Sequence, residues 1–270
     1  MEWENDQLDT LVDALLASSK YKNVCKELIT RIGAQELGKR RNIKEAIKST
    51  KNKLHQVGGA YLDIRVQYES WLNELRMAAL TSNRDNLLQI CTRIMNQHAS
   101  TRERLPILEH FYSEIFTCLP PIRSVLDVAC GFHPLAIPWM SLPENTEYYA
   151  CDIYQDMMDF LHTWMGIINI QAHTEVQDVI QQCPGYKVDL AFILKAIPCL
   201  EQIDKSAGSH LLHTINADHL VVSFPISSLG GKRKGMMEHY EAHFRNLVAN
   251  DTWEIKKLEF SSELVFVVTK

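Results

Sequence analysis

The chain has 270 residues, of which 46% are hydrophobic and 23% charged, and its formal net charge is −5. This is the composition of an ordinary globular protein, and the length is comfortable for two domains. No apolar run approaches the roughly 18 residues that cross a bilayer, and the N-terminus is acidic and amphipathic, unlike a signal peptide. We therefore expect a cytoplasmic protein without a membrane partner. The seven cysteines are odd in number and show no C-x-x-C pairing, so we expect reduced thiols and neither a disulfide framework nor a metal site.

Positive charge gathers near the N-terminus. Residues 20–53 contain eleven Lys or Arg and three Glu, a local charge of +8, whereas residues 105–270 carry −9. A run of basic residues is usually a solvated helix face. It is also the pattern of a surface that binds phosphates, and charge alone leaves both interpretations open.

Residues 1–100 have helical periodicity and contain no convincing strand. Apolar residues recur at the i, i+3, i+4 spacing over 8–16, with Asp6 as the expected N-cap. Further helices are expected over about 23–37, 43–54, 63–80 and 83–97. In the helix over 43–54, Lys44, Lys48 and Lys51 lie opposite the apolar side. The sequence thus predicts a helical domain over 1–100 with basic residues on one surface.

From residue 101 the pattern changes. After one further helix at about 101–116, apolar runs alternate with helical or loop segments, and these runs lie at 124–129, 147–151, 170–176, 188–194 and 219–224. Such alternation predicts a parallel sheet covered by helices on both faces. The last two strand-like runs, 252–260 and 263–269, are joined by two residues and must form an antiparallel hairpin. We predict an α/β fold over 101–270, a doubly wound, Rossmann-like sheet of the methyltransferase type with a C-terminal antiparallel hairpin.

In a doubly wound sheet, ligands bind beyond the carboxyl ends of the strands. The first strand ends in Ala129-Cys130-Gly131, where a glycine lets the backbone approach a ligand, but the G-x-G-x-x-G spacing of dinucleotide sites is missing. Asp152 ends the second strand, placed either to accept the two ribose hydroxyls of an adenosine or simply to cap the next helix. Asp178 follows the third strand, where it can accept a hydrogen bond from an adenine amino group. Lys195 ends the fourth, and the four ends in this order indicate an adenosine pocket.

Two other segments carry candidate chemistry. In His98–Arg104, one of the two arginines could turn toward the strand ends and hold a carboxylate, although a helix start explains the segment as well. The segment Ser223–Gly235 is either a surface loop or a substrate loop, whose glycines let it close and whose cations meet phosphates.

These segments resemble a known family. They are HASTRER (98–104), VLDVACGFHPLA (125–136), CDI (151–153), VQDV (176–179), FILKAIPCLE (192–201) and SFPISSLGGKRKG (223–235). They are similar to segments of the aminoglycoside-resistance 16S rRNA (guanine-N7) methyltransferases, the ArmA and Rmt group. The resemblance implies transfer of a methyl group from S-adenosylmethionine to N7 of guanine-1405 in the decoding site of the assembled small (30S) ribosomal subunit. It further implies aminoglycoside resistance, a 16S rRNA partner rather than DNA, and a monomer.

Site roles also follow from the resemblance. Arg104 is implied to clamp the methionine carboxylate of the cofactor, Asp152 its ribose and Asp178 its adenine amino group. The implied cofactor-binding residues are His98, Arg104, Ala129, Gly131, Asp152, Ile153, Gln177, Asp178 and Lys195. The basic residues expected to contact RNA phosphates are Lys20, Lys22, Lys39, Arg40, Arg41, Lys44, Lys48, Lys51, Lys53, Lys232, Arg233 and Lys234. No residue is assigned to catalysis with certainty, and Lys195 and Ser223 are the candidates.

The sequence departs from the family at two places and leaves rival functions open. Phe132-His133 stands where Leu-Asn is common, and Ile226-Ser227, where Thr-Arg is common, removes a cation near the expected target base. Guanine N7 presents a lone pair and no proton, so its methylation needs no general base, which agrees with the lack of an evident catalytic dyad. The rivals are a methyltransferase of another RNA site or of a small molecule, and a non-catalytic RNA-binding protein on a degenerate cofactor fold.

Overall fold

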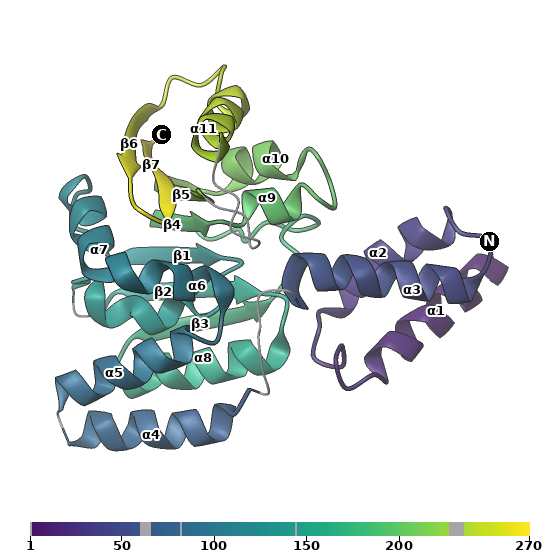
Figure 1. Ribbon diagram of the computed structural model, residues 1–270, viewed down its shortest axis with the longest axis horizontal. Coiled ribbons are helices and arrows are strands. Elements are labelled where there is room, and N and C mark those ends of the chain that lie inside the picture. The colour runs from purple at the N-terminus through teal and green to yellow at the C-terminus, as the bar shows by residue number, and fades with distance from the viewer. Residues whose placement is uncertain (1, 60–65, 82, 144, 227–234) are drawn as a thin grey trace.

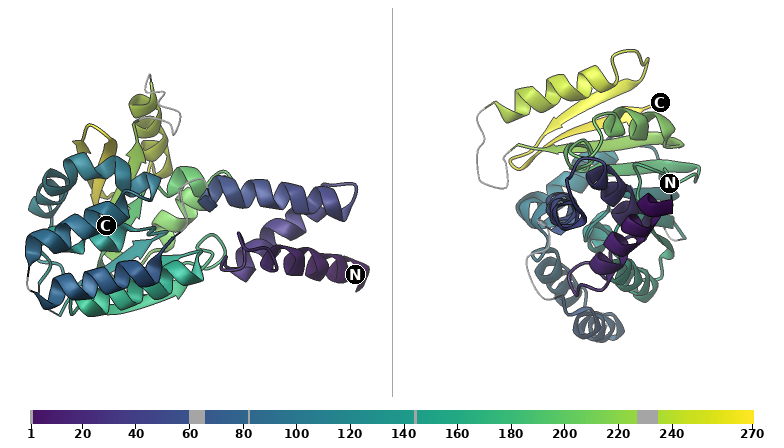
Figure 2. Two further views of the ribbon diagram at one scale, coloured as in Figure 1. Left: turned by 60° about the horizontal axis from the view of Figure 1, so that its bottom comes forward. Right: turned by 90° about the vertical axis from the view of Figure 1, so that its right-hand side faces the viewer.

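The computed structural model describes residues 2–59, 66–81, 83–143, 145–226 and 235–270. A central sheet carries helices on both faces, and three N-terminal helices form an arm that projects from one end of it (Figure 1). Two further views show the same separation of the arm from the sheet (Figure 2). Within the described residues, no helix is both long and apolar enough to cross a membrane.

The arm consists of α1 (Glu2–Leu16), α2 (Lys26–Leu37) and α3 (Ile43–Leu54), and α3 runs on into one π-helical turn, His55–Gly59. Its apolar side chains form a small core of their own, which includes Leu11, Leu15, Leu28, Ile29, Ile32 and Leu54. The three helices expected from the periodicity are confirmed. The expectation that Asp6 caps the first helix is wrong, because α1 already begins at Glu2.

Helices α4 (Tyr68–Leu80) and α5 (Arg84–Met95) share the core of the sheet rather than that of the arm. Trp71 of α4 meets the rings of Phe132 and Phe160 edge-on, with ring centroids 5.9 Å apart in both pairs. The hydrophobic core thus groups these two helices with the sheet. That residues 1–100 act together as one RNA-docking domain stays a prediction.

One expected helix is divided. The stretch predicted as a single helix over about 101–116 forms α6 (Ala99–Arg104), a 3-10 turn (Leu105–Ile107) and α7 (Leu108–Thr117). Pro106 lies in the turn, and a proline has no amide hydrogen for the helical bond and clashes with the preceding turn. Arg104 therefore ends α6, where its side chain is buried.

The seven strands are β1 (Ser124–Val128), β2 (Glu147–Asp152), β3 (Gln171–Val176), β4 (Val188–Leu194), β5 (Ala217–Pro225), β6 (Glu254–Glu259) and β7 (Glu263–Thr269). Their order in the sheet is β3-β2-β1-β4-β5-β7-β6. Strands β1 to β5 pair in parallel, and β7 pairs antiparallel with both β5 and β6. This confirms the predicted doubly wound sheet with its C-terminal hairpin. Between β1 and β4 the strand order reverses, and such a switch point opens a crevice at the carboxyl ends.

Side chains alternate between the two faces of the sheet, as the period of two in a strand requires. Val125 of β1 belongs to the core shared with α4, α5, α7 and α8 (Gln155–Ile167). Leu126 belongs to the opposite core, shared with α10 (Ala207–Thr214) and α11 (Met236–Leu247). Because both faces are covered, ligand access is left to the strand ends.

Candidate active site

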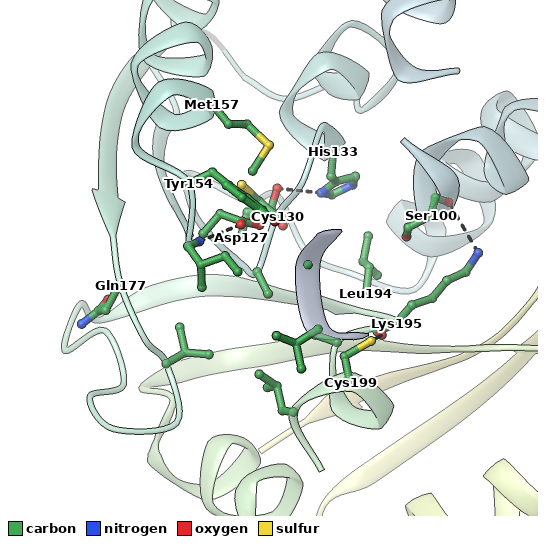
Figure 3. Close-up of a pocket in the computed structure, with 18 of the residues that line it drawn as sticks. Ser100, Asp127, Cys130, His133, Tyr154, Met157, Gln177, Leu194, Lys195 and Cys199 are labelled. Carbon is green, nitrogen blue, oxygen red and sulfur yellow. Dashed lines mark hydrogen bonds and ion pairs between the residues drawn. The ribbon is translucent and has the colours of Figure 1, made fainter. Parts of the chain in front are cut away.

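A cavity lies at the carboxyl ends of β1, β2 and β4, at the switch point (Figure 3). Strand ends, α6 and the arm all contribute to its wall. The residues expected to bind a cofactor that line it are His98, Arg104, Ala129, Asp152, Ile153, Gln177, Asp178 and Lys195, whereas the expected Gly131 is not among the described residues that line it. The arm adds Leu28, Val57 and Gly58. The fold therefore brings together side chains that lie far apart in the sequence.

The turn after β1 contains two left-handed residues, Ala129 with a φ of 51° and Gly131 with a φ of 52°. A side chain at position 131 would be strained by this backbone conformation. Its Cβ would also lie 2.7 Å from Cε1 of His98. The amide of Gly131 donates to Oδ2 of Asp152 over 2.9 Å, and this bond ties the end of β1 to the end of β2.

Asp152 is a half-buried acceptor rather than a helix cap. Its Oδ1 accepts a hydrogen bond from the amide of Ile153 over 2.6 Å. The N-cap of α8 is Tyr154, and the helix has no side-chain cap bond. Burial raises the pKa of Asp152 to about 6, although the amides of Gly131 and Ile153 lower it in part. The ionised carboxylate would be stabilised by further donors, such as a pair of hydroxyl groups.

The end of the third strand holds an ion pair that the sequence did not predict. Arg31 of α2 donates to both carboxylate oxygens of Asp178, from Nε over 2.6 Å and from Nη2 over 3.0 Å. The side chain of Asp178 is 4% exposed and that of Arg31 17%. Sequence reasoning missed Arg31 because it is one member of a long basic run, with no local feature that distinguishes it.

At the other end of the cavity, the buried Arg104 pairs with Glu263, the first residue of β7. Nε of the guanidinium lies 2.8 Å from Oε1, and Nη2 donates to Oε2 over 2.9 Å. Burial by itself would raise the pKa of Glu263, but the charges of Arg104 and Lys195 lower it to about 2. Sequence reasoning missed Glu263, although a charged residue opening the apolar run ELVFVVT was a signal.

Lys195 joins the same cluster from the end of β4. Its backbone is left-handed, with a φ of 58°. Its ammonium donates to Oε2 of Glu103 over 2.7 Å and lies 3.3 Å from Oε1 of Glu263. Ser223 is buried and donates to Glu263 over 2.8 Å. Of the two catalytic candidates, Lys195 alone is among the described residues that line the cavity.

Asp127, the acidic residue inside β1, has two hydrogen-bond partners. Nδ1 of His133 lies 2.7 Å from its Oδ2, and the hydroxyl of Tyr148 donates to the same oxygen over 2.9 Å. His133 opens the 3-10 segment His133–Trp139 that follows the turn. Phe132 is buried against Trp71 of α4. Phe132 and His133, the first of the two departures from the family pattern, thus hold the turn against β1 and α4. In the second, Ile226-Ser227, Ser227 lies outside the described residues.

The basic residues of the arm fall into two groups. Arg40 and Lys53 bind the buried carboxylate of Glu36, at 2.9 and 3.1 Å. The others are exposed or half-buried, namely Lys20, Lys22, Lys39, Arg41, Lys44, Lys48 and Lys51. Lys232, Arg233 and Lys234 lie outside the described residues. Arg40 and Lys53 therefore also hold the arm together.

Comparisons with known proteins identify similar chains. A family model described as ribosomal RNA methyltransferase (FmrO) matches residues 17–267. The chain is 33% identical over 268 residues to the 16S rRNA (guanine(1405)-N(7))-methyltransferase of Micromonospora rosea, covering 98% of both chains. It is 34% identical over 270 residues to the protein of that name from Frankia casuarinae, covering 99% of this chain and 95% of that one. A solved structure of the 16S rRNA methyltransferase RmtF in complex with S-adenosyl-L-homocysteine has a TM-score of 0.83 at 27% identity, covering 98% of both chains.

Proposed function

The chain belongs to the FmrO family of ribosomal RNA methyltransferases, and on that premise we propose that it transfers a methyl group from S-adenosylmethionine to N7 of guanine 1405 of 16S rRNA. The observation that carries the proposal is the cavity at the switch point. It has acidic groups at the ends of β2 and β3 and a cluster of ion-paired side chains, which includes Arg104 and Lys195, beside the end of β4. Relatives named for this reaction match the chain over nearly its whole length.

The residues of the cavity fit S-adenosylmethionine. Asp152 offers a half-buried carboxylate to the two ribose hydroxyls. Oε1 of Gln177 is buried without a hydrogen-bond partner among the described residues, and a buried acceptor of this kind is satisfied when a ligand donates to it. Gly131 lets the turn after β1 pack closely against the ring of His98, which lines the cavity. These groups would hold the adenosine part of the cofactor.

The ion-paired cluster fits the amino-acid part. Arg104 lines the cavity, and a guanidinium suits a carboxylate. Arg104 and Lys195 are balanced by Glu263 and Glu103, so the cluster adds no net positive charge. This balance favours a cationic ligand, since an uncompensated cation would repel a sulfonium centre. When bound, S-adenosylmethionine supplies an electrophilic methyl group.

Chemistry at guanine N7 requires positioning rather than proton transfer. N7 presents a lone pair and no proton. The protein therefore has to hold N7 in line with the methyl group at about 3 Å and to exclude water. No side chain of the cavity needs to act as a general base. Lys195, whose ammonium is held by Glu103 and Glu263, is proposed to position rather than to carry a proton.

We also propose that the arm docks on the RNA. Lys44, Lys48 and Lys51 are spaced to share one face of α3, and Lys39 and Arg41 are exposed in the turn before it. Double-helical RNA is recognised largely by shape and through its phosphates. Cationic side chains on a projecting arm are suited to both tasks.

The proposed substrate is 16S rRNA within the assembled 30S subunit, and the proposed acting form is a monomer. A ribosomal substrate places the reaction in the cytoplasm. Methylation of the decoding site would confer resistance to aminoglycosides, as the resemblance to the ArmA and Rmt group implies.

The test is transfer of a labelled methyl group to three acceptors, namely 30S subunits, free 16S rRNA and small metabolites. We expect incorporation into 30S subunits. Incorporation only into free RNA or a metabolite would favour the rival methyltransferases. A protein that binds subunits but shows no affinity for S-adenosylmethionine would instead be the non-catalytic rival.

A further inference from the structure

The arm forms part of the wall of the proposed cofactor site. Three of its residues line the cavity. Backbone hydrogen bonds fasten it directly beside the end of β2, from the amide of Cys25 to the carbonyl of Ile153 over 2.7 Å and from the amide of Gln155 to the carbonyl of Asn23 over 2.8 Å. The arm is thus attached at the point where the adenosine part of the cofactor would lie.

Arg31 is the charged side chain that the arm directs to this site. It binds both carboxylate oxygens of Asp178, and the amide of Ile180 donates to Oδ1 over 3.2 Å. A two-point contact between planar groups sets the plane of the carboxylate as well as its position. Leu28, one helical turn before Arg31, lines the cavity, so one face of α2 supplies both residues.

We propose that Arg31 is a positioning residue of the cofactor site, which holds the carboxylate of Asp178 in the orientation that accepts the adenine amino group. Because this role needs an adenine in the cavity, it rests on the proposed function. It also links RNA docking to cofactor binding. A movement of α2 on docking would move the guanidinium that orients Asp178, and such a link acts in both directions.

A merely structural role of Arg31 has a different consequence. If Arg31 only fastened the arm, its loss would lower stability or weaken all ligands of the cavity alike. If it orients Asp178, its loss weakens ligands that carry an amino group at C6 of the purine. S-adenosylhomocysteine has this amino group, whereas S-inosylhomocysteine has a carbonyl oxygen there and offers the carboxylate no amino donor.

The experiment measures binding of both compounds to the intact protein by calorimetry. We expect the wild type to prefer S-adenosylhomocysteine. Arg31→Ala should lose about tenfold in affinity for this ligand and little for S-inosylhomocysteine. Arg31→Lys keeps the charge but not the two-point contact, so it should lose part of the preference.

Two further variants serve as controls. Lys26→Ala removes an exposed cation from the same helix and should leave both affinities unchanged. In the background of Asp178→Asn, Arg31→Ala should cause no further loss of S-adenosylhomocysteine affinity, because the two residues act through one contact.

An unchanged preference in folded Arg31→Ala overturns the inference. Should that variant fail to fold, an unchanged preference in Arg31→Lys does the same. A wild type that binds S-adenosylhomocysteine without preference over S-inosylhomocysteine also overturns it and leaves the proposed function standing. A wild type that binds neither compound overturns the proposed function, and the inference with it.

Discussion

The guanidinium of Arg104 and the carboxylate of Glu263 form an ion pair, with one hydrogen bond and a second contact of 2.8 Å, between residues 159 positions apart in the chain. The pair joins α6 to the last strand inside the wall of the cavity. Lys195 lies 3.3 Å from the same carboxylate. Because two buried cations depend on Glu263, we expect this carboxylate to be the most sensitive single position of the cluster.

Replacing Glu263 by glutamine should lower the free energy of unfolding by about 3–5 kcal/mol, since the buried Arg104 loses its counter-charge and Lys195 keeps only Glu103. Urea unfolding measures the change. The folded-state pKa of about 2 lies below the ordinary value of 4.5. The stabilising contribution is therefore present above pH 4.5 and is lost as the pH falls toward 2, so the difference between the variant and the wild type should shrink over this range.

The matched control for this substitution is Glu259→Gln. Glu259 lies on β6 of the same hairpin, where its side chain is 49% exposed and pairs with Lys257. An exposed ion pair contributes at most about 1 kcal/mol. If both substitutions lowered the free energy of unfolding by equally small amounts, this would contradict the role of Glu263 as the counter-charge of Arg104.

Cofactor binding should depend on pH through Asp152. Its pKa of about 6 means that the carboxylate takes up a proton just below neutral pH, and a protonated carboxyl is a poorer acceptor for ribose hydroxyls. Affinity for S-adenosylhomocysteine should therefore fall by up to about tenfold per pH unit below pH 6. The stability of the ligand-free protein should depend on pH in the opposite direction. Because the folded-state pKa of Asp152 is raised, its ionisation costs stability, and this stability is lost as the pH rises through about 6.

Calorimetry at a series of pH values tests this dependence, with Asp152→Asn as the control. The variant should bind weakly at every pH and show a flat profile. Parallel profiles for the variant and the wild type would show that another group is responsible.

The turn after β1 should not tolerate a side chain at position 131. Gly131→Ala should destabilise the protein by about 1–3 kcal/mol and weaken cofactor binding, because the backbone is left-handed and the new Cβ would meet His98. Gly166→Ala in α8, where an added Cβ meets nothing within 4 Å, should stabilise by about 0.5–1 kcal/mol. Thermal unfolding compares the two. A Gly131→Ala variant with the stability and affinity of the wild type would refute the steric argument.

The basic face of α3 should contribute to RNA binding and not to cofactor binding. Replacing Lys44, Lys48 and Lys51 by glutamine should reduce the slope of log affinity for 30S subunits against log salt by about two to three units, since three phosphate contacts are lost. Affinity for S-adenosylhomocysteine should not change. Lys256→Gln, at an exposed position of β6, should leave the slope unaltered. A salt dependence equal to that of the wild type in the triple variant would remove these lysines from the interface.

Much of the fold could be predicted from the sequence because its strands are strongly patterned. Runs such as 124–129 and 188–194 are mostly apolar, with one acidic residue each, as is typical of strands that are buried on both faces. The acidic residues Asp152 and Asp178 could be placed at one site because the carboxyl ends of parallel strands meet at one edge of a sheet. Both line the cavity.

The contacts that the sequence did not predict join distant segments. The pairing of Arg31 with Asp178 and that of Arg104 with Glu263 cannot be predicted from one segment, since each pair forms only when two separate elements pack. The packing of α4 could not be predicted either. Its apolar side indicates that the helix is buried, but not that it packs on the sheet rather than on the arm. The break at Pro106 is different, because the proline was a local signal and was overlooked.

The most direct measurement is the position of the methyl group on the RNA. 30S subunits are incubated with the protein and S-adenosylmethionine, and 7-methylguanine is mapped by borohydride reduction, aniline cleavage and reverse transcription. We expect one new stop, at guanine 1405 of 16S rRNA, which is absent without S-adenosylmethionine. A stop at another nucleotide, or none in subunits to which the protein binds, would contradict the proposed function.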